Sequence, residues 1–305
     1  MVGKRKVKTS YSDKIFDTVN ILIMVVLLVV FIWPLWFVLI SSFSDPAEVM
    51  AGHVVLWPKG TTLHSYQELF QYERIWLGYR NSLFYTVVGT ALNMVMTVLC
   101  AYPLSRKDWM PRNLFMKMCL LTMYFGGGLI PVYLVVKKLG LVDSMWAMII
   151  PGAMSFYNAL IVRSYFMNSI PNELKEAADL DGANPLQYLL RVVLPLSKPV
   201  LAVVGLYYAV GHWNDYYTAL IYIYDRDKAP LQTVLRDVLM SASAIKDLTT
   251  NASTSDAALT LAERIRFAQS LKYTSIIVAI LPMMIIYPFI QKYFVKGVMV
   301  GGIKG

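Results

Sequence analysis

The sequence predicts an all-α integral membrane protein with six transmembrane helices. Of the 305 residues, 57% are hydrophobic and only 15% are charged, and long apolar runs recur along the chain. That much apolar surface does not fit inside one soluble core. A run of about 20 apolar residues crosses a bilayer as a helix. The sequence shows no repeat and no separate soluble domain.

Charge and cysteine content narrow the function classes. The net charge of +9 comes with basic residues beside apolar runs, which are topology signals and contacts for anionic lipids, so we expect no nucleic-acid partner. Cys100 and Cys119 lie in apolar runs without a CxxC partner, and the three histidines form no HExxH or similar cluster. Neither a disulfide scaffold nor a metal site is indicated.

The N-terminal part combines a basic arm with the first apolar run. Residues 1–14 are expected to form a cytoplasmic arm, and residues 15–78 the first transmembrane helix, at about 20–40, and an external loop. A secretory signal peptide has the same order of charge and apolarity, but this apolar run is too long and no A-x-A-like site follows it. Pro34 inside the run predicts a kink.

The other five spans are expected in a core at 79–290, before a cytoplasmic tail at 291–305. Their expected positions are about 81–104, 114–136, 144–165, 199–224 and 271–289, with a loop at 166–198 and an external insert at 225–270. Phe125-Gly126-Gly127-Gly128 interrupts the third span. Two interpretations of it stay open: close helix packing over small residues, or a break or hinge.

Six spans place both termini on one side of the membrane. The N-terminal arm, the 105–117 and 163–198 connections and the tail lie on that side and hold more than half of the 28 lysines and arginines. Short loops rich in these residues stay in the cytoplasm. The sequence therefore predicts cytoplasmic termini and a cytoplasmic 166–198 loop.

This loop has the pattern of two short helices joined by a turn. Pro171 suits the first turn of a helix, with Ser169 near enough to cap it, and Gly182 suits the left-handed position after a helix end. Asn184-Pro185 then predicts a second helix towards Leu194-Pro195. On the first helix we expect one face with Leu174, Ala177 and Ala178 and another with Glu176 and Asp179.

The helix pair is either a passive connection or a docking element for a protein. An interfacial anchor would carry a broad apolar face flanked by lysines, whereas this helix has small residues and a net negative charge beside an anionic leaflet. Its acidic first helix would also repel nucleic-acid phosphates. The physical pattern leaves docking and passive connection open.

The loop resembles the EAA signature of bacterial ABC-importer permeases. The matching residues are Glu176-Ala177-Ala178, Gly182, Val192 where isoleucine is usual, and Leu194-Pro195. The tail from Tyr293 to Gly305 is similar to the MalG-like half of carbohydrate importers but departs from it at Val300-Gly301-Gly302. The segments 125–131 and 211–216 resemble the oligo- and polysaccharide branch, which is paired with lipoprotein-type solute-binding proteins.

The resemblance implies a permease core at 79–290 and no chemistry within this subunit. The sequence has no GxxxxGK[ST] run, so ATP hydrolysis would fall to a separate ATPase, with no catalytic residue, metal or bound cofactor here. In the family the EAA helix sits in a groove of the ATPase and couples nucleotide-driven closure to helix rotation. The implied coupling residues are Glu176, Ala177, Ala178, Asp179, Asp181, Gly182, Ala183, Leu194 and Pro195.

The implied partners are a second homologous permease, two cytoplasmic ATPase subunits, an extracytoplasmic solute-binding protein, membrane lipid and a carbohydrate. The alternatives are a permease for a non-sugar solute, an intramembrane enzyme, and a membrane assembly or anchor protein; the spans offer few groups for catalysis. The sequence assigns no residue to the substrate path. Trp213, Tyr216 and Tyr217 fit sugar stacking or an interfacial aromatic belt, and Asn93 and Asn158 fit interhelical bonding or ligand contact.

Overall fold

A computed structural model of the chain describes residues 11–249, 271–288 and 291, with side chains for all of these except 241–249. Every regular element in the described ranges is helical, which confirms the all-α prediction. Residues 1–10 of the expected N-terminal arm, 250–270 of the insert and 292–305 of the tail lie outside the described residues. The described chain belongs to two compact units, Met1–Leu69 with Val238–Val278, and Phe70–Asp237 with Ala279–Gly305.

The first unit contains the N-terminal span. Helix α1 (Tyr11–Ser42) continues through Pro34 and exposes nearly all of its apolar side chains, as a helix surrounded by lipid does. The segment after it was expected to be a loop, but it forms α2 (Pro46–Met50) and α3 (His64–Gln71). Trp36 fixes this segment by donating from Nε1 to the Leu56 carbonyl at 3.0 Å.

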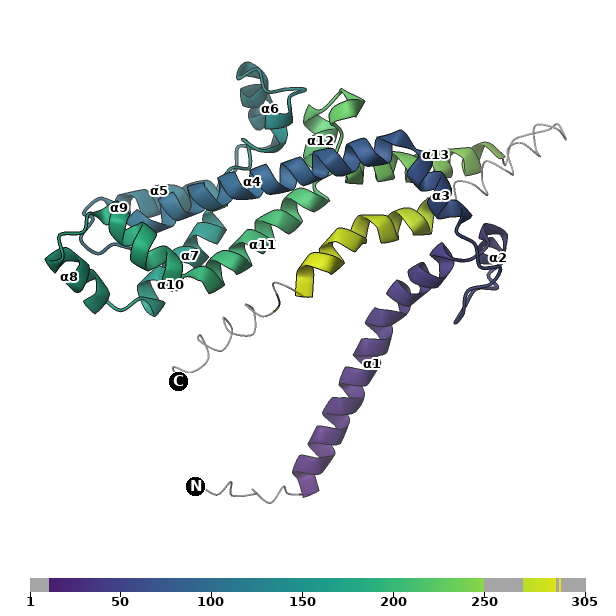
Figure 1. Cartoon of the computed structure of the whole chain (residues 1–305), viewed down its shortest axis with the longest axis horizontal. Helices are drawn as coiled ribbons and strands as arrows, with labels where there is room; N and C mark the ends of the chain where they lie inside the picture. The colour runs from purple at the N-terminus through teal and green to yellow at the C-terminus, as the bar shows by residue number, and fades with distance from the viewer. Residues whose placement is uncertain (1–10, 250–270, 289–290, 292–305) are drawn as a thin grey trace. The chain divides into compact units, whose positions relative to one another are not determined.

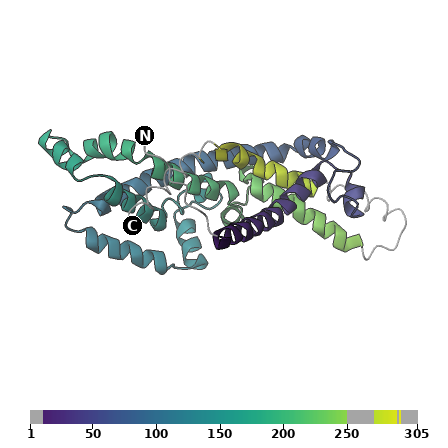
Figure 2. The same ribbon diagram turned by 90° about the horizontal axis from the view of Figure 1, so that it is seen from below.

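The second unit is built around α4 (Glu73–Ser105). Helices α7 (Phe156–Ser169) and α11 (Lys198–Asn214) pack along it, and α4 and α11 lie side by side in both views (Figure 1, Figure 2). The buried face of α4 repeats every four residues and is mostly small or polar, which lets helix backbones approach closely. The residues of this repeat are Asn81, Tyr85, Gly89, Asn93, Thr97 and Ala101, and Gly78, Ser82 and Thr86 are buried beside them.

The expected third span is broken at its glycines. Helices α5 (Arg112–Tyr124) and α6 (Leu129–Lys138) meet at an angle of 112°, and Gly128 has φ of +82° and ψ of 171°, a backbone conformation essentially confined to glycine. Within this chain nothing lies within 4 Å of a Cβ built at Gly126 or Gly128. The break is therefore confirmed, and close packing of this chain over these two glycines is wrong.

The expected continuous fourth span is also wrong. Its first part forms a short 3₁₀ helix, η1 (Met145–Met148), and a turn at Pro151-Gly152, and only then does α7 begin, capped by Ser155. Proline lacks the N–H that an interior helical position donates. With 14 residues, α7 is about 21 Å long, shorter than the hydrocarbon core.

The remaining spans follow the predicted positions more closely. Helix α11 ends at Asn214 and α12 (Tyr217–Tyr222) follows the predicted interruption, where the Asp215 carboxylate accepts the Thr218 N–H at 3.0 Å. The insert begins with η3 (Arg226–Lys228) and α13 (Leu231–Thr249). The sixth predicted span is a helix at Leu271–Pro288.

Six spans are not all found as single helices. Among the described residues, three helices are long and apolar enough to cross a membrane: Tyr11–Ser42, Glu73–Ser105 and Leu271–Pro288. Two bent pairs raise the number to five when each pair is one span: α5 with α6, and Pro185–Leu196 with α11, which meet at 83°. The described helices therefore agree with a membrane protein of several spans, and the number of six spans stays a prediction.

Candidate functional site

The 166–198 loop contains the predicted helix pair. Helix α8 (Glu173–Leu180) comes first, and a continuous helical run follows it as α9 (Pro185–Tyr188), the π-helical η2 (Leu189–Val193) and α10 (Leu194–Leu196). In Figure 1, α8 lies at the left end of the second unit, well away from α12. The predicted start at Pro171 is wrong by two residues, and Ser169 is the last residue of α7 and provides no cap for α8.

Gly182 ends α8 as predicted. It has φ of +71° and donates its N–H to the Asp179 carbonyl, while the Ala183 N–H reaches the Ala178 carbonyl at 2.9 Å. This pair of bonds is the Schellman arrangement, which satisfies the last carbonyls of a helix and favours glycine at the left-handed position. Asp181 is the C-cap residue and donates its N–H to the Ala177 carbonyl.

Asn184 begins the second helix as predicted. Its side chain accepts the Gln187 N–H at 2.8 Å, and the Gln187 side chain accepts the Asn184 N–H at 3.0 Å. This reciprocal pair is a capping box. Sequence reasoning missed the part played by Gln187, although its spacing of three residues from Asn184 was visible.

Leu194 and Pro195 directly follow the π-helical η2, shortly before the helical run changes direction. A proline inside a helix leaves the carbonyl four residues earlier without its donor and clashes with it, and the π-helical turn lies directly before Pro195. Leu194 packs against the main core cluster. The run bends by 83° into α11 at Ser197, so these residues set the direction in which the chain leaves the loop.

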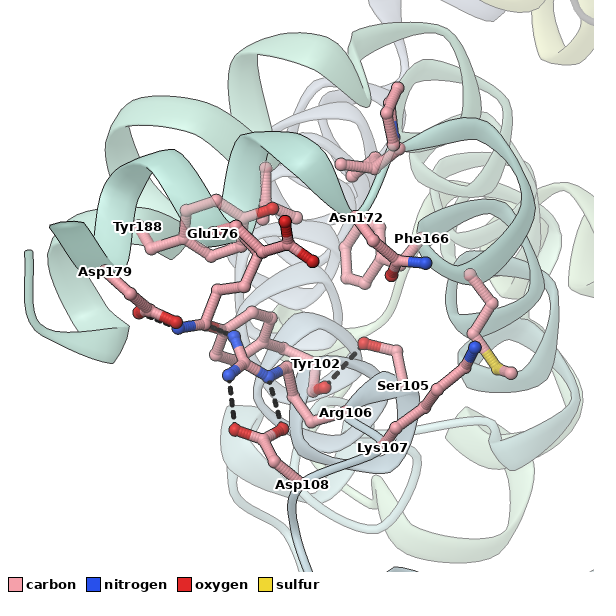
Figure 3. Close-up of a pocket in the computed structure, with 15 residues that line it drawn as sticks. Tyr102, Ser105, Arg106, Lys107, Asp108, Phe166, Asn172, Glu176, Asp179 and Tyr188 are labelled. Atoms are coloured by element: carbon pink, nitrogen blue, oxygen red, sulfur yellow. Dashed lines mark hydrogen bonds and ion pairs between the residues drawn. The ribbon is translucent and has the colours of Figure 1, made fainter.

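The faces of α8 differ from the predicted ones. Ala178 packs against the core cluster, whereas Leu174, Ala177 and Leu180 are exposed. Glu176 and Asp179 line a pocket of about 360 Å³ between α8 and the end of α4 (Figure 3). The two alanines therefore do not share one contact face: Ala178 contacts this chain's own core, and Ala177 is open to a partner.

Arg106, at the C-terminal end of α4, organises this pocket. Its guanidinium forms two hydrogen bonds to the Asp108 carboxylate, of 2.9 and 2.6 Å, and lies over the rings of Tyr102 and Tyr188, 5.8 and 5.9 Å from their centroids. Because the hydrogen-bonded guanidinium favours the ionised form, the pKa of Asp108 falls to about 2. Figure 3 shows these groups converging below α8.

From α8, Lys175 reaches the same group of side chains. Its Nζ lies 5.8 Å from the centroid of the Tyr188 ring and forms an ion pair with Asp179 in its own helix. The Tyr102 hydroxyl donates to the Pro185 carbonyl at 3.0 Å. We call Tyr102, Arg106, Asp108, Lys175, Asp179 and Tyr188 the Tyr188 cluster. Sequence reasoning missed it, because the residues come from three separate segments.

A second polar group lies between α4, α7 and α11. The Asn93 amide donates to the Gly152 carbonyl at 2.5 Å and its oxygen lies 2.6 Å from His212 Nε2, so Nε2 carries the proton in this arrangement. Tyr208 bonds to Thr97 at 2.7 Å and accepts the Ser155 N–H at 3.0 Å. Asn93 therefore bonds across segments, one of its two predicted roles.

The other predicted aromatic positions divide. Trp213 is buried and donates from Nε1 to the Ala279 carbonyl at 3.0 Å, which makes it a packing residue. Tyr216 and Tyr217 are exposed. Among the described residues no group of three or more histidine, cysteine, aspartate or glutamate side chains comes together as a metal site.

Together, the helical spans and the capped helix pair at one end of the bundle define a polytopic membrane protein. The family model for the binding-protein-dependent transport system inner membrane component matches residues 7–300. The chain belongs to this family, and it is accordingly a permease subunit of an ABC transporter and not an enzyme.

Individual relatives extend this result. The chain is 40% identical to Protein LplC of Bacillus subtilis strain 168, over 96% of each chain. It is 37% identical to the polygalacturonan/rhamnogalacturonan transport system permease protein YtcP of the same organism, over 96% of this chain and all of the relative. A solved bacterial ABC transporter involved in the import of the acidic polysaccharide alginate matches with a TM-score of 0.82 and 32% identity, over 93% of this chain and 98% of the other.

Proposed function

We propose that this chain is the permease subunit of an ATP-driven importer that carries an oligosaccharide or a polysaccharide fragment across the bacterial plasma membrane. The observation that carries the proposal is the similarity, over nearly the whole chain, to a permease named for polygalacturonan and rhamnogalacturonan and to a solved alginate importer. Polygalacturonan and alginate are both polymers of uronic acids. An acidic saccharide is therefore the substrate class to test first.

The complex would contain four further parts. A second homologous permease completes the pathway, two cytoplasmic ATPase subunits hydrolyse ATP, and an extracytoplasmic solute-binding protein delivers the saccharide. The absence of a GxxxxGK[ST] run from this sequence supports separate ATPase subunits. Both termini of this chain lie in the cytoplasm in this proposal, as the distribution of lysine and arginine predicts.

In this complex, α8 is the element that contacts the ATPase. Its exposed Leu174, Ala177 and Leu180 supply an apolar contact strip, and Glu176 has no ion-pair partner among the described residues, so it is available to a basic group. Gly182 and Asn184 fix the turn by backbone geometry and capping. The coupling role of the EAA residues thus depends on a rigid, outward-facing helix.

Ligand binding by the cognate solute-binding protein tests the substrate proposal. We expect it to bind galacturonate or alginate oligomers in calorimetry, and we expect proteoliposomes with the complete transporter to take up the bound oligomer only with internal ATP. Maltotriose and a mixture of amino acids serve as controls for neutral sugars and non-sugar solutes. Binding of a non-sugar solute alone would support the alternative permease function, and a complex without ATP-dependent uptake would favour an assembly or anchor role.

A further inference from the structure

Helix α8 has little helix packing to hold it. It shares no extended contact with any other helix of the described chain, and only Ala178 joins the main core cluster. A partner that displaces α8 can move the other helices only if a rigid contact joins α8 to them. The remaining contacts of α8 with the bundle therefore decide how its motion is transmitted.

The Tyr188 cluster makes that connection. Tyr188 is buried in the core cluster with Tyr102 of α4, and its ring meets a cation from α4's end and a cation from α8. The side chains of Arg106 and Lys175 are only 16% and 24% exposed. Cation–π contacts strengthen when water is excluded from the cation.

Ion pairs keep both cations in place. Asp108 holds the guanidinium of Arg106 with two bonds, and Asp179 holds the ammonium of Lys175. Lys175 also helps to lower the pKa of Asp108, so the α4–α5 connection and α8 interact electrostatically. The Tyr102 hydroxyl adds a direct bond from α4 to the backbone of α9.

We propose that the Tyr188 cluster is the joint that fixes α8 to α4, so that a displacement of α8 by the ATPase moves the central helix of the bundle. This inference rests on the proposed coupling role of α8. Tyr188 and Arg106 are positioning residues in it: they touch neither ATP nor the transported solute. Removing the aromatic ring or the cation loosens the joint while the outward face of α8 stays available to the ATPase.

The test compares variants in the complete transporter reconstituted in lipid nanodiscs and proteoliposomes. For Tyr188→Leu and Arg106→Gln we expect ATPase subunits to co-purify as with the wild type, while uptake and the binding-protein-stimulated part of ATP hydrolysis fall by about tenfold. Tyr188→Phe keeps the ring and is the control, so it is expected to retain most uptake. Arg106→Lys keeps a cation but loses the two-bond contact with Asp108, so its uptake should lie between those of Arg106→Gln and the wild type. The double variant Arg106→Gln/Tyr188→Leu should lose less uptake than the product of the two single fold-losses, because the two residues share one of their contacts.

A distance measurement separates transmission from simple stability. Spin labels on cysteines at Glu173 and Met110, which are both exposed and lie outside the proposed ATPase contact strip, report the position of α8 relative to the α4–α5 connection; Cys100 and Cys119 are first replaced by serine. In the otherwise unchanged protein we expect the same distance with and without trapped nucleotide. In Tyr188→Leu the distribution should broaden or shift on nucleotide trapping.

Three results would overturn the joint. They are wild-type uptake in Tyr188→Leu, loss of the ATPase subunits from that variant, and a label distance that changes with nucleotide in the wild-type background. A different variant tests the coupling role of α8 itself. If α8 has no such role, Glu176→Lys leaves ATPase co-purification and uptake unchanged. The two proposals therefore fail on different measurements.

Discussion

Gly89 allows His212 to reach Asn93 across the α4–α11 interface. A Cβ built on Gly89 would lie 2.5 Å from Nε2 and 2.6 Å from Cε1 of the His212 ring. We expect Gly89→Ala to displace the ring, break its bond to Asn93 and lower stability by about 1–3 kcal/mol, as overpacking of a filled interface does. The measurement is the thermal unfolding midpoint of the detergent-purified complex.

Gly205→Ala is the matched control on the partner helix. Its new Cβ would meet only the Met94 sulfur, at 3.8 Å, which is an ordinary contact, so its midpoint should stay within error of the wild type. Adding His212→Ala to Gly89→Ala should recover part of the loss, because the clash is gone. An equal effect of the two glycine variants would contradict this account of the interface.

The ion pair between Arg106 and Asp108, in the connection between α4 and α5, makes the free energy of unfolding depend on pH, and the pKa of Asp108 sets the sign of this dependence. That pKa is lowered to about 2 by Arg106, below the ordinary value near 3.9 for aspartate. A lowered pKa means that the stabilising contribution is complete above pH about 4 and is lost as the pH falls towards 2. The carboxylate side chain is 68% exposed, so the contribution is expected to be at most about 1 kcal/mol.

The measurement compares the unfolding midpoints of Asp108→Asn and the wild type between pH 7 and pH 3. We expect a small difference at neutral pH that shrinks below pH 4, and no such difference in an Arg106→Gln background. A difference that grows on acidification would have the wrong sign for this ion pair.

At the level of elements, the break between α5 and α6 depends on one glycine of three. Gly128 alone of Gly126, Gly127 and Gly128 has a positive φ, and with ψ of 171° it lies in a region that is essentially confined to glycine and costs another residue about 1–3 kcal/mol. Gly128→Ala is expected to lower the unfolding midpoint and disturb the 112° bend, while Gly126→Ala, with free space around its Cβ, should change little. Equal unfolding midpoints for these two variants would show that the bend does not need the positive φ of Gly128.

Elements fixed by local chemistry could be predicted from the sequence. The turn at Gly182 and the helix start at Asn184-Pro185 follow from residues that cap or end helices wherever they occur. Apolar composition alone did not reveal that the fourth span is broken, since the turn at Pro151-Gly152 lies within an otherwise apolar stretch. The interruption between α11 and α12 was predicted near residues 211–215, and the structure shows the Asp215 carboxylate accepting the Thr218 N–H there.

Contacts between distant segments could not be predicted. Of the expected faces of α8, Glu176 and Asp179 do line one pocket, but Ala178 meets the core while Leu174 and Ala177 are exposed, because the core contact depends on segments far away in sequence. Asn93 was recognised as an interhelical candidate, yet its partners Gly152 and His212 became visible only in the structure. Periodicity assigns residues to faces and does not say what each face meets.

For the whole molecule, α4 connects the 166–198 loop to the segments at its other end. Towards its beginning Asn81 donates to the Asp227 and Ala229 carbonyls, and Tyr85 to the Lys228 carbonyl. Asp143 reinforces the region by accepting the N–H groups of Tyr224 and Asp225. A movement that enters at the Tyr188 cluster would thus reach η3 through one continuous helix.

The coupling proposal predicts the phenotype of Glu176→Lys in the assembled transporter. The side chain is exposed and lines the pocket beside α8, so reversing its charge should leave insertion and abundance unchanged. Pairing with a basic group of the ATPase would turn into repulsion, and we expect loss of ATPase co-purification, of uptake, or of both. Quantitative blots of the membrane, pull-down of the ATPase and ATP-dependent uptake measure the three properties.

Glu173→Lys is the matched control, because it makes the same charge change on the same helix outside the EAA signature and should retain most uptake. Wild-type co-purification and uptake in Glu176→Lys would remove α8 from the coupling pathway.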